Sequence, residues 1–241
     1  MSDRFKVEDL LQQYVTGNRS FSGANLHEVD LINQQLLQVD FSRADLRQSR
    51  LGKTNFSHSN FQAADLSEAI LWGTNLTAAN LSQAILRETD LSGAILSDAC
   101  LVESHLVKAS FCGANLSHAQ LDRALMIEAD LRMGSDHQTN LSYASLKSAN
   151  LSYANLSGAL FYRADLAGAK LCRTILFQRS FQRLSAADLT EANLQGADLS
   201  YTDLSHVILH RANLRHADLT GTILNKADLE GATMPDGSIH E

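Results

Sequence analysis

The 241-residue sequence lacks an apolar run long enough to cross a bilayer. Its first 20 residues also lack a basic start followed by an apolar stretch and a small-residue cleavage site, which is the pattern of a secretion signal. Cysteine is scarce, and the odd number of residues forms no complete disulfide framework, so we expect reduced thiols at Cys100, Cys112 and Cys172. We therefore predict a soluble, cytoplasmic protein that does not bind membranes.

Positive charge is also in short supply, since 20 Lys and Arg residues are outnumbered by 27 Asp and Glu residues and the net charge is -7. Non-specific nucleic-acid binding needs clustered Lys and Arg against phosphates, so direct binding to nucleic acid is not expected. Most Asp residues stand just before a Leu or Phe, a position that Asn also takes freely. Short side chains that bond nearby backbone explain this preference better than the alternative, an acidic binding surface.

Sequence signatures of catalysis are nearly absent. The stretch Gly52-Lys53-Thr54 resembles the end of a phosphate-binding loop, but Arg47 stands where that loop requires Gly. No set of Ser, His and Asp has the arrangement that nucleophilic catalysis needs. We therefore predict a protein that is not an enzyme and has neither a cofactor nor a small-molecule substrate.

The nine His residues show no spacing typical of metal ligands. His206, His210 and His216 fall at different points of the repeat described below, and only His118 could approach His137 and Asp136. Solvated side chains are the simpler interpretation, and no metal site is predicted.

What the sequence has in abundance is one five-residue word. It reads small residue, Asn or Asp, Leu, then two free positions, as in Ala149-Asn150-Leu151-Ser152-Tyr153. A period of five suits neither a helix nor a flat strand, so the chain must turn a corner in every word. In an extended segment the small residue and the Leu point the same way, which we take as inward, and the two free residues make the corner. The central Leu, Phe or Met recurs at every fifth position from Phe21 to Leu131, from Leu141 to Phe181 and from Leu189 to Met234.

The phenylalanines indicate how many words close one coil. Sorting by a period of 20 places most of the central phenylalanines in one class, whereas a period of 15 scatters them: Phe21, Phe41, Phe61, Phe161 and Phe181. We therefore predict four words per coil, an all-β square solenoid whose coils rise about 4.8 Å each. The same count places Cys112 and Cys172 in one column, about 14 Å apart and beyond disulfide reach.

Words of this kind, repeated along most of the chain, resemble the pentapeptide-repeat family. The resemblance implies a right-handed quadrilateral β-helix. Some segments have residues that the five-residue word does not explain, and these resemble one family member, which regulates heterocyst differentiation in cyanobacteria. The segments are Arg50–Ser57, Asp65–Gly73, Leu171-Cys172-Arg173 and the ending Met234–His240. That resemblance implies binding to a transcriptional regulator of the HetR type, in opposition to its inhibitory peptide.

Residues 1–17 precede the repeats and have the apolar spacing of a one-sided amphipathic helix, in Val7, Leu10, Leu11, Tyr14 and Val15. We predict that this helix caps the first coil, whose strand edge would otherwise be open. A partner-binding helix is the alternative.

Two faults interrupt the repeat domain, which spans residues 18–234. In residues 132–140, Asp136 stands where an inward Leu is due, so this segment is predicted to leave the rod as a loop. At residues 179–187 the register slips, because Leu189 follows Phe181 by eight positions. We interpret this slip as three residues inserted, or two lost, at a corner. Residues 235–241 form a polar tail.

Several surface residues depart from the repeat pattern and are candidates for protein binding. Apolar residues and one His are predicted to stack on one side of the rod, where β-branched filler is the alternative interpretation: Ile85, Val102, His105, Val107, Leu125 and Ile127, with Met133 near the loop. Trp72 is expected at an exposed corner, and Trp is common in binding hot spots. Arg163 is placed in a mostly basic column with Arg123, Tyr143 and Arg183, which would suit an acidic partner or face solvent.

The sequence therefore favours a non-enzymatic protein-interaction module, expected to be a monomer, because repeat rods offer long preformed surfaces. The alternative class is the DNA-mimicking pentapeptide-repeat protein that acts on DNA gyrase. That class predicts an acidic face, whereas here the repeat itself explains most acidic residues.

Overall fold

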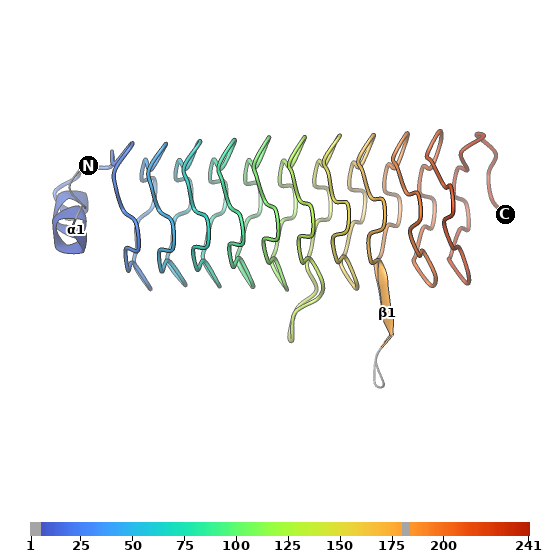
Figure 1. Ribbon diagram of the computed structural model, residues 1–241, viewed down its shortest axis with the longest axis horizontal. Helices are drawn as coiled ribbons and strands as arrows, with labels where there is room; N and C mark the ends of the chain where they lie inside the picture. The colour runs from blue at the N-terminus through green and yellow to red at the C-terminus, as the bar shows by residue number, and fades with distance from the viewer. Residues whose placement is uncertain (1–5, 180–183) are drawn as a thin grey trace.

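The computed structural model describes residues 6–179 and 184–241, which form an elongated stack of coils (Figure 1). Parallel bridges join the residue before each central residue to its equivalent 20 positions later, as in Asp45 to Asp65 and Ile85 to His105. Four five-residue words therefore make one coil with four sides. The fold is a quadrilateral β-helix, and the prediction of four words per coil is confirmed.

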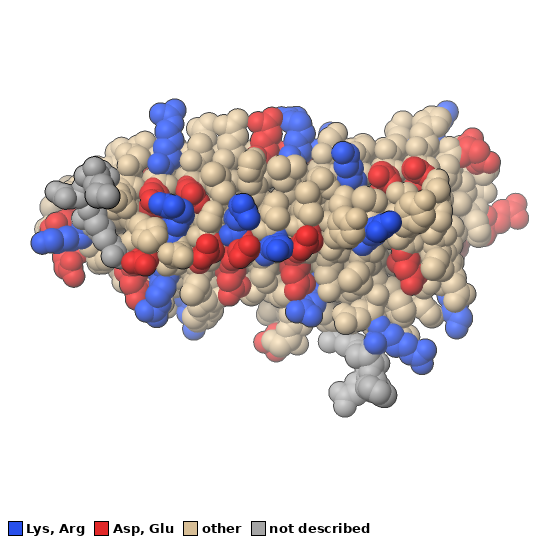
Figure 2. Space-filling view, in the orientation of Figure 1, with Lys and Arg blue, Asp and Glu red and all other residues tan. Residues whose placement is uncertain are grey.

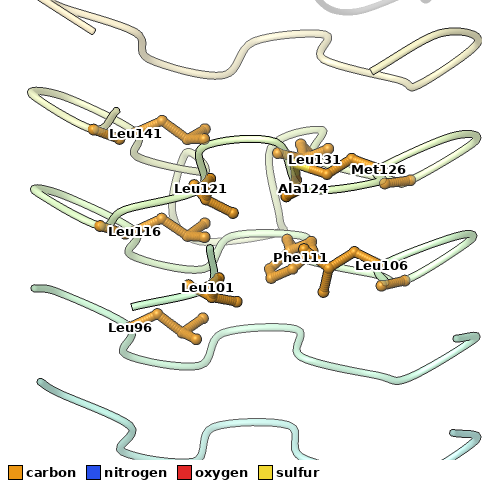
Figure 3. Close-up of a cluster of buried hydrophobic side chains, with 14 of the residues drawn as sticks. Leu96, Leu101, Leu106, Phe111, Leu116, Leu121, Ala124, Met126, Leu131 and Leu141 are labelled. Carbon is orange, nitrogen blue, oxygen red and sulfur yellow. The ribbon is translucent and has the colours of Figure 1, made fainter. Parts of the chain in front are cut away.

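The core consists of the central residues and the small residues two positions before them, which are buried along almost the whole rod. In Figure 3 equivalent residues of successive coils lie above one another, with Leu96, Leu116 and Leu141 in one column. The core near the first coils is aromatic. There the rings of Phe41 and Phe61 pack against each other, with their centroids 5.6 Å apart. Because the central and small residues fill the inside of the rod, the side chains that differ from word to word lie on the surface.

Most corners are two-residue turns, closed by a backbone hydrogen bond such as Ala24 N–H to the Phe21 carbonyl, 3.1 Å. The second turn residue has positive φ even where it is not Gly, as at Gln48 (57°) and Ala63 (55°). No Val, Ile or Thr is found among these positive-φ residues. Branched side chains clash in the left-handed region, so they are confined to the first turn position, as at Ile32.

The Asn or Asp before each central residue has a local role. Its side-chain oxygen accepts the N–H of the first turn residue, as from Arg47 N to Asp45 Oδ1 (3.2 Å) and from Ser152 N to Asn150 Oδ1 (3.1 Å). Either side chain can make this bond, which explains why the position accepts both. The acidic residues of the repeat thus follow from turn chemistry.

Helix α1, Val7–Val15, lies at the first coil (Figure 1). Leu10 is fully buried, and the Tyr14 hydroxyl donates to the Leu37 carbonyl at 3.2 Å. The guanidinium of Arg19 lies 3.8 Å from the centre of the Tyr14 ring. Residues 1–5 of the predicted 1–17 segment lie outside the described residues. In the described part of the chain, α1 included, no helix is long and apolar enough to cross a membrane.

Two excursions leave the rod from one corner (Figure 1). The first lies within residues 132–140, where the bridge from Asn115 to Asn140 spans 25 positions, so five residues are added and Asp136 is exposed. The second is an antiparallel hairpin of β1, Phe177–Arg179, and β2, Leu184–Ala186. Around it the bridge from Leu160 to Asp188 spans 28 positions, so eight residues are added to the coil. The interpretation of three residues inserted, or two lost, was therefore wrong, and Phe181 itself lies outside the described residues.

The five added residues shift every later column by one word. Phe161 follows the column of Phe56, so the prediction that it shares a column with Phe61 was wrong. The predicted column of Cys112 and Cys172 was wrong for the same reason, since the Cys172 thiol lies against Ser152 Oγ at 3.1 Å. All three cysteines are free thiols.

The rod ends differently from how it begins. The tail after Met234 turns back, and Thr233 pairs with Ile239 in an antiparallel bridge. Leu219 and Leu224 in the last coil are partly exposed, unlike the fully buried central residues of interior coils. The tail thus pairs with part of the final coil edge.

Candidate protein-binding surface

Three non-repeat residues occupy consecutive coils on one side of the rod. Bridges run from Ile85 to His105, from His105 to Leu125 and then to Asn150, so the three lie directly above one another. Val107 and Ile127 stand at the corner on one edge of this column, and their carbonyls accept the N–H groups of Glu88 and Lys108, each at 3.0 Å. Val102 stands at the corner on the other edge. We call these six residues the apolar face.

The apolar face departs from what the repeat favours. Ile85 and Leu125 have no side-chain acceptor for the N–H two positions later, whereas Asp65 and Asn150 in the flanking coils make this bond at 3.0 and 3.1 Å. Isolated apolar residues do occupy the same word position elsewhere, as at Ile95, but its bridge partners are Asn75 and Asn115. In the column of Leu125 the substitutions are consecutive, with His105 between two aliphatic residues, and Val107 and Ile127 at the adjoining corner add further apolar area.

Charged side chains border the apolar face on both edges. On one edge Glu103 accepts from Gln83 Nε2 at 3.1 Å and from Arg123 Nη2 at 2.8 Å. The hydrogen bond from Gln83, followed by the bond and charge of Arg123, holds the pKa of Glu103 below its usual value. On the other edge Lys108 Nζ and Glu128 Oε2 are 3.9 Å apart. The arrangement is an apolar centre with a polar rim, which is the usual anatomy of a protein interface.

Trp72 and Met133 lie on the corner from which the loop and hairpin emerge, which we call the tryptophan corner. One side of the coil separates this corner from the apolar face, so these two residues do not extend that face. The indole of Trp72 lies over Gly52, where an added Cβ would come within 2.8 Å of Nε1, and Lys53 Nζ lies 4.7 Å from its ring centre. Trp72 is 38% exposed.

A groove of about 330 Å³ lies at the tryptophan corner between Trp72 and the loop, and its lining includes Gly93, Cys112, Gly113 and Gly134–His137. Burial raises the pKa of the Cys112 thiol, which disfavours the reactive thiolate. Beyond the groove, Met133 Sδ accepts from Ser185 Oγ at 3.4 Å, so the loop contacts the hairpin.

Arg163 does not belong to a basic column. Because of the five-residue insertion, its corner is shared with His118 and Tyr143 rather than Arg123, and Arg183 lies outside the described residues. The rings of His118 and Tyr143 stack at 5.0 Å, and Arg163 Nε donates to Glu191 at 2.6 Å. An acidic partner would compete with Glu191 for this guanidinium.

Charge is mixed on the visible side of the rod, where Lys and Arg alternate with Asp and Glu along its length (Figure 2). Several acidic side chains have a basic partner in range, as Asp45 and Asp65 have in Arg47, whose nitrogens lie 2.7 Å and 3.8 Å from their carboxylate oxygens. This side of the molecule therefore has no continuous field of one sign.

The sequence patterns did not predict one cluster of potential metal ligands. His210, Asp228 and Glu230 each offer a ligand atom within 4.8 Å of the other two, and this is the only such group of three among the described residues. The signal was present, because Glu230 stands 20 positions after His210 and therefore directly beside it in the next coil. The spacing of the His residues does not reveal the cluster, because the other two ligands are carboxylates.

Comparisons with known proteins agree with this architecture. The family described as pentapeptide repeats matches in eight copies, over residues 24–62, 59–98, 94–132, 139–176 and 197–236. The chain is similar to the crystal structure of HetL, a pentapeptide repeat protein involved in heterocyst differentiation regulation from the cyanobacterium Nostoc sp. strain PCC 7120. The identity is 54%, the coverage is 98% of this chain and 100% of that one, and the TM-score is 0.96.

Two further solved structures match with lower similarity. Rfr23, a pentapeptide repeat protein from the cyanobacterium Cyanothece 51142, is 28% identical over 55% of this chain and 91% of its own, with a TM-score of 0.39. QnrB1, a plasmid-mediated fluoroquinolone resistance protein, is 21% identical over 86% of this chain and 92% of its own, with a TM-score of 0.37. No match was found among curated protein sequences.

Proposed function

This chain belongs to the pentapeptide-repeat family, and on that premise we propose that it is a non-enzymatic protein-interaction module that regulates heterocyst differentiation. It acts by binding a transcriptional regulator of the HetR type and opposing that regulator's inhibitory peptide. The observation that carries the proposal is the 54% identity to HetL over 98% of the chain. The protein works in the cytoplasm, where such a regulator binds DNA, and makes no direct contact with nucleic acid itself.

The apolar face is the docking surface in this proposal. Its backbone is held in a continuous ladder, as where Leu125 N bonds to Ser104 O at 2.9 Å, so binding orders little backbone. Its centre offers aliphatic area that the fold does not require. Removal of such area from water on binding is favourable by roughly 25 cal/mol per Å² before the costs of association.

The test uses the HetR-type regulator of the same organism and two variants of the face. The double variant Leu125→Asp and Val107→Asp should keep its melting temperature, because both side chains are on the surface. It should weaken binding in calorimetry by about tenfold or more, equivalent to ~1.4 kcal/mol.

The second variant, Leu125→Asn, restores the repeat residue. It should be at least as stable as the parent, by up to about 1 kcal/mol, because Asn can accept the N–H of Ile127 as Asn150 accepts that of Ser152. It should nevertheless bind the regulator more weakly.

Ile95→Asp is the matched control, since Ile95 has the same word position and is 42% exposed but lies between Asn75 and Asn115. Its binding should equal that of the parent. Unchanged affinity in both Leu125 variants would move the site elsewhere, and no binding by the parent protein would contradict the proposed partner. Light scattering of the parent tests the expected monomer.

A further inference from the structure

The cluster near the C-terminal end of the rod combines an imidazole with two carboxylates. His210 and Glu230 are the first turn residues of equivalent words in neighbouring coils, and Asp228 precedes Glu230 by two positions. His210 Nδ1 and Glu230 Oε2 are 4.0 Å apart, and one ligand atom of Asp228 lies within 4.8 Å of both other ligand atoms. Small rotations of the side chains would bring all three atoms onto one ion.

The backbone beneath the cluster is held by the ladder between coils. Leu209 N bonds to Asp228 O at 2.8 Å, and Arg211 N bonds to Glu230 O at 2.9 Å. Asp228 Oδ1 accepts the N–H of Glu230 at 3.2 Å, which orients the carboxylate and leaves its second oxygen available. The backbone therefore holds the three potential metal-ligating residues in place before any ion binds, and only their side chains need to adjust.

The charge balance at this corner differs from that of other corners. Arg47 lies between Asp45 and Asp65, and Lys147 Nζ lies 3.2 Å from Asp165. Among the described residues, Asp228 and Glu230 form no ion pair with Lys or Arg, and their partner is the imidazole of His210, which is a metal ligand when neutral. Two carboxylates this close repel each other, and a divalent cation between them would remove the repulsion.

We propose that His210, Asp228 and Glu230 bind one divalent transition-metal ion of the Zn²⁺ type. Imidazole favours Zn²⁺, Ni²⁺ or Co²⁺ over Ca²⁺ and Mg²⁺, which prefer oxygen ligands alone. Three protein ligands leave at least one coordination position, which water fills. The Glu230 side chain is 75% exposed, so the ion has direct access from solvent.

The test is calorimetric titration of the full, EDTA-treated chain with ZnCl₂ under reducing conditions. One Zn²⁺ should bind per chain, and its saturation should raise the melting temperature, because an ion that binds the folded state stabilises it. His210→Gln and Glu230→Gln should each weaken binding by about tenfold or more, equivalent to ~1.4 kcal/mol. Both variants should melt like the parent in EDTA, and CaCl₂ should not compete.

His27→Gln is the matched control, because His27 Nδ1 also lies near a carboxylate, Glu28, at 3.9 Å, but belongs to no group of three ligands among the described residues. It should bind Zn²⁺ as the parent does. Paramagnetic Co²⁺ gives an independent location, since it should broaden the NMR signals of the His210 ring first. Absence of binding, unchanged binding by His210→Gln, or broadening centred on a cysteine would each overturn the proposal.

Discussion

At the scale of single residues, the left-handed corner explains a preference that hydrophobicity does not. The second turn residue is Glu, Gln, Arg, Lys, His, Tyr, Ala, Ser, Asn, Asp or Gly, yet never Val, Ile or Thr in the positive-φ set. A left-handed residue with a side chain costs roughly 1–2 kcal/mol relative to its right-handed form. The fold accepts this cost at corner after corner, because the turn allows the next strand to pair with the coil below.

Ala63, with φ of 55° and an exposed side chain, tests this interpretation. Ala63→Val should lower the free energy of unfolding by about 1–2 kcal/mol, because a branched Cβ clashes in this conformation. Ala63→Gly should change it by less than about 1 kcal/mol, since relief of strain offsets the greater freedom of the unfolded chain. Urea titration measures both. Equal free energies of unfolding for the two variants would show that the left-handed conformation of the corner does not disfavour a branched side chain.

At the scale of elements, α1 and the two excursions have different relations to the rod. Helix α1 packs on the core through Leu10 and closes one end. The loop and the hairpin replace two-residue turns and leave the coils on either side paired, as the bridge from Asn115 to Asn140 shows. Additions at corners are tolerated because the ladder resumes with the next small residue, Thr139 or Ala187, both fully buried.

Removal of residues 1–17 should expose the edge of the first coil and the core residues that Leu10 covers. The remaining coils should still fold, because each contacts mainly its neighbours. The open edge should pair with other molecules, so the truncated protein should elute as end-to-end oligomers in size-exclusion chromatography. Leu10→Asp in the full chain is the milder companion variant and should shift the elution in the same direction. Monomeric elution of both would remove the capping role of α1.

At the scale of the whole molecule, stability comes from one continuous column of buried residues, and the described part of the chain has no second core to compensate for damage. Leu151 lies in the middle of this column and is fully buried. Leu151→Asp should prevent soluble folding, because an unpaired charge would be buried at a cost of several kcal/mol. Tyr153→Asp, two positions along at an exposed corner, should remain soluble. A parental melting temperature for Leu151→Asp would contradict the assignment of the inward side.

The five-residue period alone determined the solenoid and the inward and outward positions, because these properties repeat within every word and need no knowledge of distant contacts. The number of words per coil came instead from the 20-residue spacing of Phe21, Phe41 and Phe61. The apolar face was also predictable, because Ile85, His105 and Leu125 precede the first insertion and a count of 20 aligns them. The close relation to HetL was visible in residues outside the word and is supported by the comparison.

Only the tertiary structure decided which residues become neighbours beyond the loop. An insertion of any length can be accommodated at a corner, and the sequence does not show at which residue the chain rejoins the coil. Five residues leave before Asn140 and eight before Asp188, so Arg163 meets Tyr143 and Glu191 instead of Arg123. The positive φ of the corners likewise depends on how one coil lies upon the next. Contacts between coils follow from stacking geometry, whereas burial within a word follows from its own residues.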